Sequence, residues 1–178
     1  FCEDFESIAV GNPIAETSPS WNSWDELMNG AIAPFTDDAR ISNTQASSGD
    51  NSLYFPPTAA AGPEDILLMF DPTLNITQIS LPTLSTPYVI GNFTFSQMMY
   101  VRAGAGAYFN FQAENTPGVS WSLEVNLTDN GSQVGDILMS NTSGTSFNAE
   151  YPVNTWFEIK FEINLSSNNW EVFVDGVS

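Results

Sequence analysis

The sequence predicts an all-β protein, and the clearest reason is a period of two in residues 156–165, where apolar and polar side chains alternate. The apolar side chains that share one side of this pleat are Phe157, Ile159, Phe161, Ile163 and Leu165. Such alternation indicates a strand with one face in a core and the other in water. A second apolar segment, 170–174, follows the turn-forming residues 166–169 and ends at Asp175-Gly176. The two segments therefore predict an antiparallel hairpin.

The rest of the chain shows the same pattern of short apolar or alternating segments separated by turns. It predicts about ten short strands with hardly any helix. The predicted strands are residues 1–8, 39–42, 52–55, 66–70, 93–102, 107–112, 119–127, 136–139, 156–165 and 170–174. In 119–127 the side chains predicted to face the core are Val119, Trp121, Leu123, Val125 and Leu127. Residues 11–34, 72–91 and 141–148 are predicted to be irregular, apart from one possible helical turn at 25–28. Many short strands separated by turns are typical of sandwiches and barrels.

We therefore predict a two-sheet antiparallel β-sandwich, and the long loops between the early strands favour a jelly roll. At 178 residues the chain suits one domain, so we expect a single jelly-roll domain over 1–178.

Charge and composition exclude several classes of partner. The chain has three basic residues and 21 acidic ones, a net charge of −18, so nucleic acid and anionic membrane surfaces are not expected partners. No apolar run is long enough to cross a bilayer, so membrane insertion is not expected either. The absence of His removes the commonest general base, and the single Cys2 excludes an internal disulfide. A surface rich in acid and amide groups but poor in Lys predicts a secreted, extracellular protein.

Two segments carry a resemblance to a known family. Residues 156–163, followed by 169–176, resemble the laminin-G-like branch of the concanavalin A-like lectin/glucanase superfamily. The opening at 2–6 resembles the MAM branch, and 47–53 is similar to jelly-roll modules of secreted bacteroidete-type surface proteins. The resemblance implies a jelly-roll sandwich with further strands after the Asp-Gly turn. We therefore expect this chain to lack its C-terminal strands or to belong to a longer chain.

A hard-cation site is the first chemical hypothesis. Asp4 and Glu6 are two residues apart on the predicted first strand, so their side chains would share one side. Asp50 and Asn51 occupy a turn next to Gly49, and calcium prefers carboxylate, amide and backbone oxygens. In the modules that the chain resembles, calcium lies where the first strand meets such a turn. We expect a structural Ca²⁺ held by Asp4, Glu6, Asp50 and Asn51; the alternative is a solvated acidic edge.

A sugar-binding face is the second hypothesis, because aromatic rings can stack on sugars while planar amides bind their hydroxyl groups. The residues expected to contact carbohydrate are Tyr100, Arg102, Tyr108, Asn110, Gln112 and Glu124, together with Trp21 and Trp24 from a loop. This prediction places the strands that carry Tyr100, Tyr108 and Glu124 next to one another. The alternative is a hydrated outer face, with the two Trp closing the core.

Hydrolysis is less favoured. Laminarinase-like relatives of the superfamily use Glu-x-Asp-x-x-Glu, whereas the nearest central segment here, 123–128, has Glu124 as its one carboxylate. The sequence therefore predicts a non-catalytic, secreted module that binds a polysaccharide or surface glycan and mediates adhesion. The alternative is a structural subunit of an extracellular filament or sheath, whose partners are copies of itself or neighbouring domains recruited through an open sheet edge.

Overall fold

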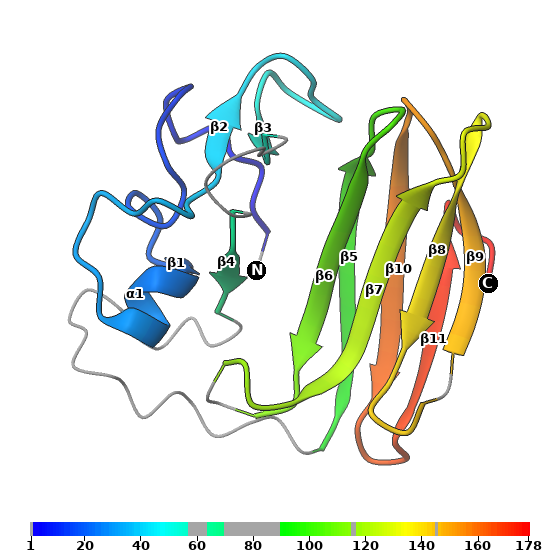
Figure 1. The fold of residues 1–178 in the computed structure, drawn as a ribbon. Helices are drawn as coiled ribbons and strands as arrows, with labels where there is room; N and C mark the ends of the chain where they lie inside the picture. The colour runs from blue at the N-terminus through cyan, green and yellow to red at the C-terminus, as the bar shows by residue number, and fades with distance from the viewer. Residues whose placement is uncertain (1, 57–63, 70–89, 115–116, 145) are drawn as a thin grey trace. The chain divides into compact units, whose positions relative to one another are not determined.

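The computed structural model describes residues 2–56, 64–69, 90–114, 117–144 and 146–178, which fall into two compact units, 1–85 and 86–178 (Figure 1). The predicted all-β class is confirmed, because the described elements are antiparallel strands and one short helix. A single domain over 1–178 stays a prediction, and each unit is described by itself below.

The second unit contains two antiparallel sheets. One has the order β11-β10-β5, made of β5 (Asn92–Tyr100), β10 (Trp156–Asn164) and β11 (Asn169–Val174). The other has the order β6-β7-β8-β9, made of β6 (Gly106–Gln112), β7 (Trp121–Asp129), β8 (Val134–Ser140) and β9 (Ser146–Pro152). The hairpin predicted at the C-terminal end is confirmed as β10 paired with β11.

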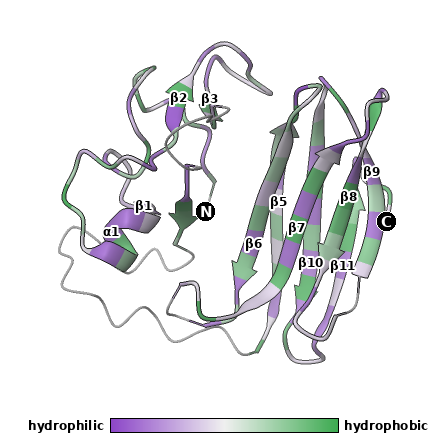
Figure 2. Ribbon diagram, viewed as in Figure 1, coloured by the Kyte–Doolittle hydropathy of each residue, from purple (hydrophilic) through white to green (hydrophobic). Residues whose placement is uncertain are grey.

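The two sheets pack face to face through one aromatic core. Phe157, Ile159 and Phe161 on β10 are 0% exposed, as their alternation predicts, and Figure 2 shows hydrophobic and hydrophilic bands along the strands of this unit. The Phe161 ring lies 5.1 Å from Phe111 and 5.9 Å from Phe109, both on β6 of the facing sheet. Edge-to-face contacts at these distances are the preferred geometry for aromatic rings. The result is an arrangement of the β-sandwich kind.

Tyr151 fills the other end of this core. It is 1% exposed, and its ring stacks on Phe157 with centroids 5.1 Å apart. Gly135 lies opposite Tyr151 in the register of β8 and β9, and a Cβ added at Gly135 would overlap the tyrosine ring. Within the described part of the chain, the buried Tyr151 hydroxyl has no hydrogen-bond partner.

The first unit has two small sheets around a smaller core. β1 (Trp21–Ser23) pairs with β4 (Ile66–Leu68), and β2 (Arg40–Ser42) pairs with β3 (Ser52–Tyr54). Their core centres on the buried side chains of Ile8, Ile14, Ala39 and Ile41. Ser23 is the N-cap of the helix α1 (Trp24–Asn29), and its Oγ accepts a hydrogen bond from the Glu26 N–H at 3.0 Å. This helix contains the helical turn predicted at 25–28.

The predicted first strand over 1–8 is wrong for the residues described, because 2–4 are irregular and 5–8 form a turn. The N–H of Phe5 donates to Glu3 Oε1 at 3.0 Å, the N–H of Glu6 donates to Asp4 Oδ1 at 3.1 Å, and Phe5 has a φ of 63°. Short acidic side chains thus take the backbone donors that a strand would use. The argument that Asp4 and Glu6 share one side of a strand fails with it.

Other differences lie in predicted loops and at one strand end. Residues 146–148 belong to β9, not to a loop, because 146–152 pair with β8 along its whole length. Val119 does not face the core but is 55% exposed, since β7 begins at Trp121, opposite a register shift at Phe111–Gln112. The predicted loop at 72–91 lies outside the described residues except for its last two.

We predict that Gly135→Ala destabilises the second unit by about 1–3 kcal/mol, because the new methyl group would overpack against the Tyr151 ring. Urea unfolding of the purified protein measures this change. Gly144→Ala is the comparison variant. An added Cβ there meets no neighbour, so any loss of stability comes from the φ of 78° and not from overpacking. An unchanged midpoint for Gly135→Ala would contradict the packing described above.

We expect Tyr151→Phe to leave the free energy of unfolding unchanged or to raise it. The substitution keeps the stacked ring and removes a buried hydroxyl that has no partner among the described residues. The same urea experiment tests this. A loss of more than about 1 kcal/mol would show that the hydroxyl makes a stabilising hydrogen bond.

Candidate functional site

The four residues predicted to bind calcium do lie together in the first unit, held by hydrogen bonds. Glu6 Oε1 accepts from the backbone N–H groups of Asp50 at 3.0 Å and Asn51 at 2.8 Å. The Asn51 amide Nδ2 donates to the backbone carbonyls of Phe5 at 3.2 Å and Ile8 at 3.4 Å. These contacts clamp the turn at 48–51 onto the N-terminal turn.

The polarity of this clamp suits an anion better than a cation. Two backbone N–H dipoles point their positive ends at one carboxylate oxygen, as in the nests that bind anions, and here the anion is the Glu6 side chain itself. Gly49 permits the approach: it has a φ of 62°, and a Cβ there would overlap the Glu6 carboxylate. In the described ranges, no group of three or more His, Cys, Asp or Glu side chains has a metal-holding arrangement. The residues as placed fit a structural clamp, and calcium binding there stays a prediction.

Four of the predicted sugar-binding residues form a hydrogen-bonded row on the outer face of the four-stranded sheet. In this row, which we call the Tyr108 row, the Tyr108 hydroxyl donates to Glu124 Oε1 at 3.1 Å and accepts from Asn110 Nδ2 at 3.2 Å. Gln112 Nε2 donates to Asn110 Oδ1, and Gln112 Oε1 accepts from the Gly118 N–H at 2.9 Å. The side chains are therefore fixed relative to one another.

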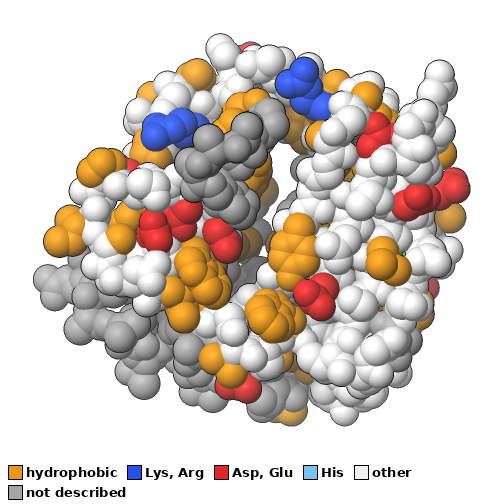
Figure 3. Space-filling model, viewed as in Figure 1, with side chains coloured by type: hydrophobic (Ala, Val, Ile, Leu, Met, Phe, Trp, Pro, Cys, Tyr) orange, Lys and Arg blue, Asp and Glu red, His pale blue; other side chains and the backbone are white. Residues whose placement is uncertain are grey.

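The register of β6 and β7 puts the Tyr108 row on the outside. Asn110 pairs with Glu124, while the neighbouring pair Phe109 and Val125 packs into the core. Because side chains alternate across a strand, Tyr108, Asn110 and Glu124 point away from it. Tyr108 is 51% exposed. Figure 3 shows that this face of β6–β9 is mostly uncharged and polar, with isolated apolar and acidic side chains.

The other predicted sugar-binding residues lie elsewhere, because the chain crosses from one sheet to the other between β5 and β6. Tyr100 is on β5, on the outer face of the three-stranded sheet, 5.6 Å from the Trp156 ring. Arg102 is exposed just after β5. The assumption that the strands of Tyr100 and Tyr108 are neighbours in one sheet was wrong, so Tyr100 and Tyr108 are on opposite outer faces.

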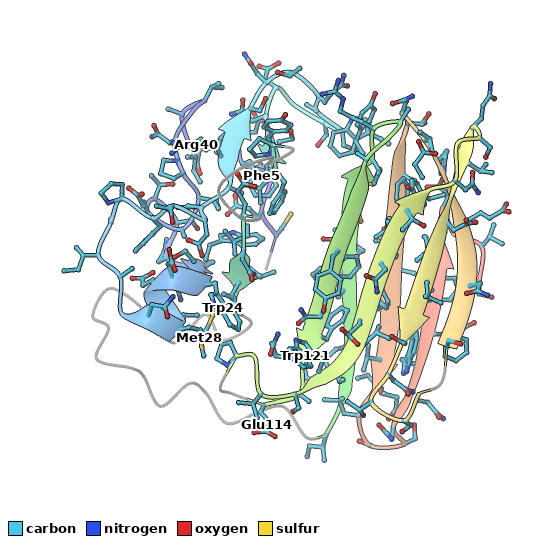
Figure 4. The ribbon with its side chains drawn as sticks, in the orientation of Figure 1. Phe5, Trp24, Met28, Arg40, Glu114 and Trp121 are labelled. Atoms are coloured by element: carbon cyan, nitrogen blue, oxygen red, sulfur yellow. The ribbon has the colours of Figure 1, made fainter. Side chains whose placement is uncertain are left out.

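The two predicted loop tryptophans belong to the first unit. Trp21 is on β1 and packs against the core of that unit, with its ring 6.4 Å from Phe5. This agrees with the alternative that Trp21 closes a core. Trp24 is the first residue of α1, on the same helix as Met28 (Figure 4).

Trp121 was not among the predicted sugar-binding residues, although it lies beside the Tyr108 row. It starts β7 opposite Gln112, where the register shifts, and is half-buried. Figure 4 shows it near Glu114, which follows β6 and accepts a hydrogen bond from Ser120 Oγ at 3.2 Å. Trp121 lies opposite Gln112 only because the register of β6 and β7 shifts between Phe111 and Gln112. No feature of the sequence predicts this shift.

A buried carboxylate lies in the first unit, among residues that no sequence pattern singled out. Asp38 is 5% exposed, and its carboxylate accepts three backbone N–H bonds at 3.0–3.1 Å, from Ile14, Ala15 and Glu16. Burial raises the pKa of Asp38 against the opposing effect of these bonds, and the nearby Glu16 charge adds to the rise. The pKa of Glu26 is also raised, by burial and then by Asp38. This carboxylate holds the 13–16 turn in place.

Comparisons with known proteins add no assignment to this geometry. No family model matches the chain, and neither a curated protein nor a solved structure does. Among the residues that the structure describes, no helix has the length and apolar character to span a membrane. The functional interpretation therefore depends on the two units themselves.

We predict that Glu6→Gln speeds amide hydrogen exchange at Asp50 and Asn51, because a neutral amide accepts their N–H bonds more weakly than a carboxylate. Glu150→Gln, at an exposed position on β9, serves as the control. Calorimetric titration of the wild type with calcium belongs to the same experiment. A binding heat that Glu6→Gln abolishes would establish the calcium site and contradict the clamp.

The raised pKa of Asp38 predicts a pH dependence. A carboxyl group with a higher pKa in the folded state stabilises the fold fully below its unfolded pKa of about 4 and loses that contribution as the pH rises through the folded pKa. The Glu16 charge contributes to the rise at Asp38, and the raised pKa of Glu26 affects stability in the same direction. The free energy of opening at Ile14–Glu16, from hydrogen exchange corrected for intrinsic rates, should therefore fall as the pH rises above about 4. In Asp38→Asn this slope should flatten; an equal slope in both proteins would contradict the assignment.

Proposed function

We propose that this chain is a non-catalytic, lectin-like carbohydrate-binding module, with the jelly-roll connectivity that its resemblance implies. Its binding surface is the outer face of the four-stranded sheet, and its ligand is a neutral saccharide on a cell surface or in a polysaccharide. The observation that carries the proposal is the Tyr108 row, an exposed aromatic ring hydrogen-bonded into a line of amide and carboxylate groups.

The groups in the Tyr108 row match what a sugar offers. A tyrosine ring gives an apolar face for the C–H side of a sugar ring, while amides donate and accept hydrogen bonds with hydroxyl groups. Because Tyr108, Asn110 and Glu124 are bonded to one another on paired strands, little side-chain freedom is lost when a ligand binds. This preorganisation distinguishes the row from a simple hydrated surface.

Charge supports a neutral ligand over an anionic one. The chain's three basic residues are Arg40 in the first unit, Arg102 after β5 and Lys160 on β10, so the strands β6–β9 that form this face carry none. Glu124 would repel a uronate or sulfate group, and no cation there would offset it. Neutral hexoses and pentoses carry no charge that Glu124 would repel.

A non-catalytic role is supported by the carboxylate content of the row. Most glycosidases place two carboxyl groups about 5 Å or about 6.5–9.5 Å apart across the scissile bond. The Tyr108 row contributes one, Glu124, and that group already accepts a hydrogen bond from Tyr108. The proposed work is therefore binding and adhesion, in an extracellular setting that suits an acidic, lysine-poor surface.

The rival proposal, a subunit of a filament or sheath, is favoured by the open sheet edges. In the described strands, β6 and β9 flank one sheet and β5 and β11 flank the other, with no closure into a barrel. Unpaired edge groups can recruit another chain. Sedimentation separates the two proposals, since a binding module stays monomeric at concentrations where a filament subunit assembles.

We predict that Tyr108→Ala weakens saccharide binding about tenfold. The ring that stacks on the sugar is lost, and so are the two hydrogen bonds that hold Asn110 and Glu124 in place. Tyr108→Phe keeps the ring and should lose less. The measurement is affinity electrophoresis in gels containing soluble glucan, xylan, mannan or, as an anionic control, alginate. Tyr54→Ala, at an exposed tyrosine on β3 of the first unit, is the matched control.

The proposal fails if none of the neutral polysaccharides retards the wild type, or if Tyr108→Ala and Tyr54→Ala are retarded equally. Stronger retardation by alginate than by the neutral polymers would overturn the charge argument. Thermal melting of each variant checks that folding is unchanged.

A further inference from the structure

A groove crosses the outer face of the three-stranded sheet, the face opposite to the Tyr108 row. It has a volume of about 600 Å³ and is lined by residues 92–94 of β5, 162–164 of β10 and 169–171 of β11. All three strands of the sheet thus contribute to it. None of its residues was among the predicted sugar-binding set.

The register arranges the polar side chains of this groove in two rows. Asn164 on β10 pairs with Asn92 on β5 and with Asn169 on β11, which gives a row of three amides across the sheet. Two residues along, Glu162 pairs with Thr94 and with Glu171. Both rows point outward, because the alternate residue Phe161 is 0% exposed in the core. Amides, carboxylates and a hydroxyl therefore converge on one surface.

Two members of the groove are fixed by neighbours. Asn164 Oδ1 accepts a hydrogen bond from the Ser167 N–H at 2.9 Å, which leaves its Nδ2 donors directed elsewhere. Glu162 Oε1 accepts from Lys160 Nζ at 2.7 Å, and that ammonium lies 4.2 Å from the centroid of the Phe173 ring. Among the described residues, the side chains of Asn92, Thr94 and Glu171 make no hydrogen bond to one another or to the rest of the sheet.

One pair of side chains in the groove opposes the stability of the sheet. Glu162 and Glu171 are directly opposite on paired strands, and like charges in that position are destabilising. Lys160 offsets part of the repulsion. A local choice that opposes the fold without a compensating structural gain is expected at functional sites. Lys160 also makes the groove unsuited to a metal ion, since its ammonium occupies the side of Glu162 that a cation would approach.

We propose that this groove is a second saccharide-binding site, for a neutral, hydroxyl-rich chain that crosses the strands. Carboxylates of Glu162 and Glu171 accept from sugar hydroxyls, and the amides of Asn92 and Asn169 both donate and accept. The proposal extends the proposed function to a second face and does not require the Tyr108 row to bind. Since the two sheets pack through their inner faces, their outer faces point apart. With the Tyr108 row as the other site, one module would hold two separate glycan chains and cross-link them.

The test is a titration of the ¹⁵N-labelled full chain with cellohexaose, xylohexaose and mannohexaose, followed by amide chemical shifts. We expect one of them to shift backbone amides at 92–94, 162–164 and 169–171, and separately those at 108–112. Asn169→Ala combined with Glu171→Gln should weaken the groove response about tenfold and leave the response at 108–112 unchanged. Tyr108→Ala should do the reverse.

The outcomes separate the two proposals. Shifts confined to 108–112 overturn the groove and leave the proposed function standing, whereas shifts confined to the groove overturn the Tyr108 row as the binding face. No shift at either site with a Kd below about 1 mM overturns both. Light scattering with the matching long polysaccharide completes the test: the wild type should cross-link it, and a variant impaired at either face should bind without cross-linking. Equal scattering from the wild type and the groove variant would contradict bivalent binding.

Discussion

The structure of the second unit depends on the contact between Phe161 and the two phenylalanines of β6, which holds the two sheets together. Burying an aromatic side chain of this kind contributes about 1.5–3 kcal/mol. The contact also fixes direction: once Phe161 points inward, Lys160 and Glu162 on the same strand must point outward. Both proposed binding faces are therefore consequences of one buried cluster, and each is as rigid as the sheet that carries it.

Alternation predicted β10, β11 and the inward set on β10 from the sequence, because a strict period of two along the whole of β10 fits a strand and does not fit a helix. The outward set of the groove was visible in the same pattern, but its partners were not. Asn164 pairs with Asn92, which is far away in the sequence, and no local pattern reports which distant strand is adjacent. The same limit led to the wrong placement of Tyr100 beside Tyr108. Local hydrogen bonds by Glu3 and Asp4 also overrode the alternation at the N-terminus.

The chain has three cations, and in its described part several carboxylates are instead hydrogen-bonded by backbone N–H groups. Asp38, Glu6 and Asp175 each receive such bonds from residues distant in sequence. Asp129 accepts one such bond from the distant Gly104 and one from Gly131 in its own turn, and these two bonds lower the pKa of its carboxyl group. Acidic side chains thus act as ties between loops, a role that ion pairs fill in more evenly charged proteins. Because these ties need no mobile partner charge, salt should weaken them less than it weakens surface ion pairs.

The position of Lys160 has a consequence for how the protein resists digestion. Proteases that cut after lysine or arginine find three candidate bonds in the whole chain, and the one after Lys160 is in the middle strand of a sheet. Cleavage needs an extended, accessible backbone, which a strand paired on both sides withholds until the sheet opens. A trypsin-type protease would therefore cut after Lys160 only once the three-stranded sheet opens.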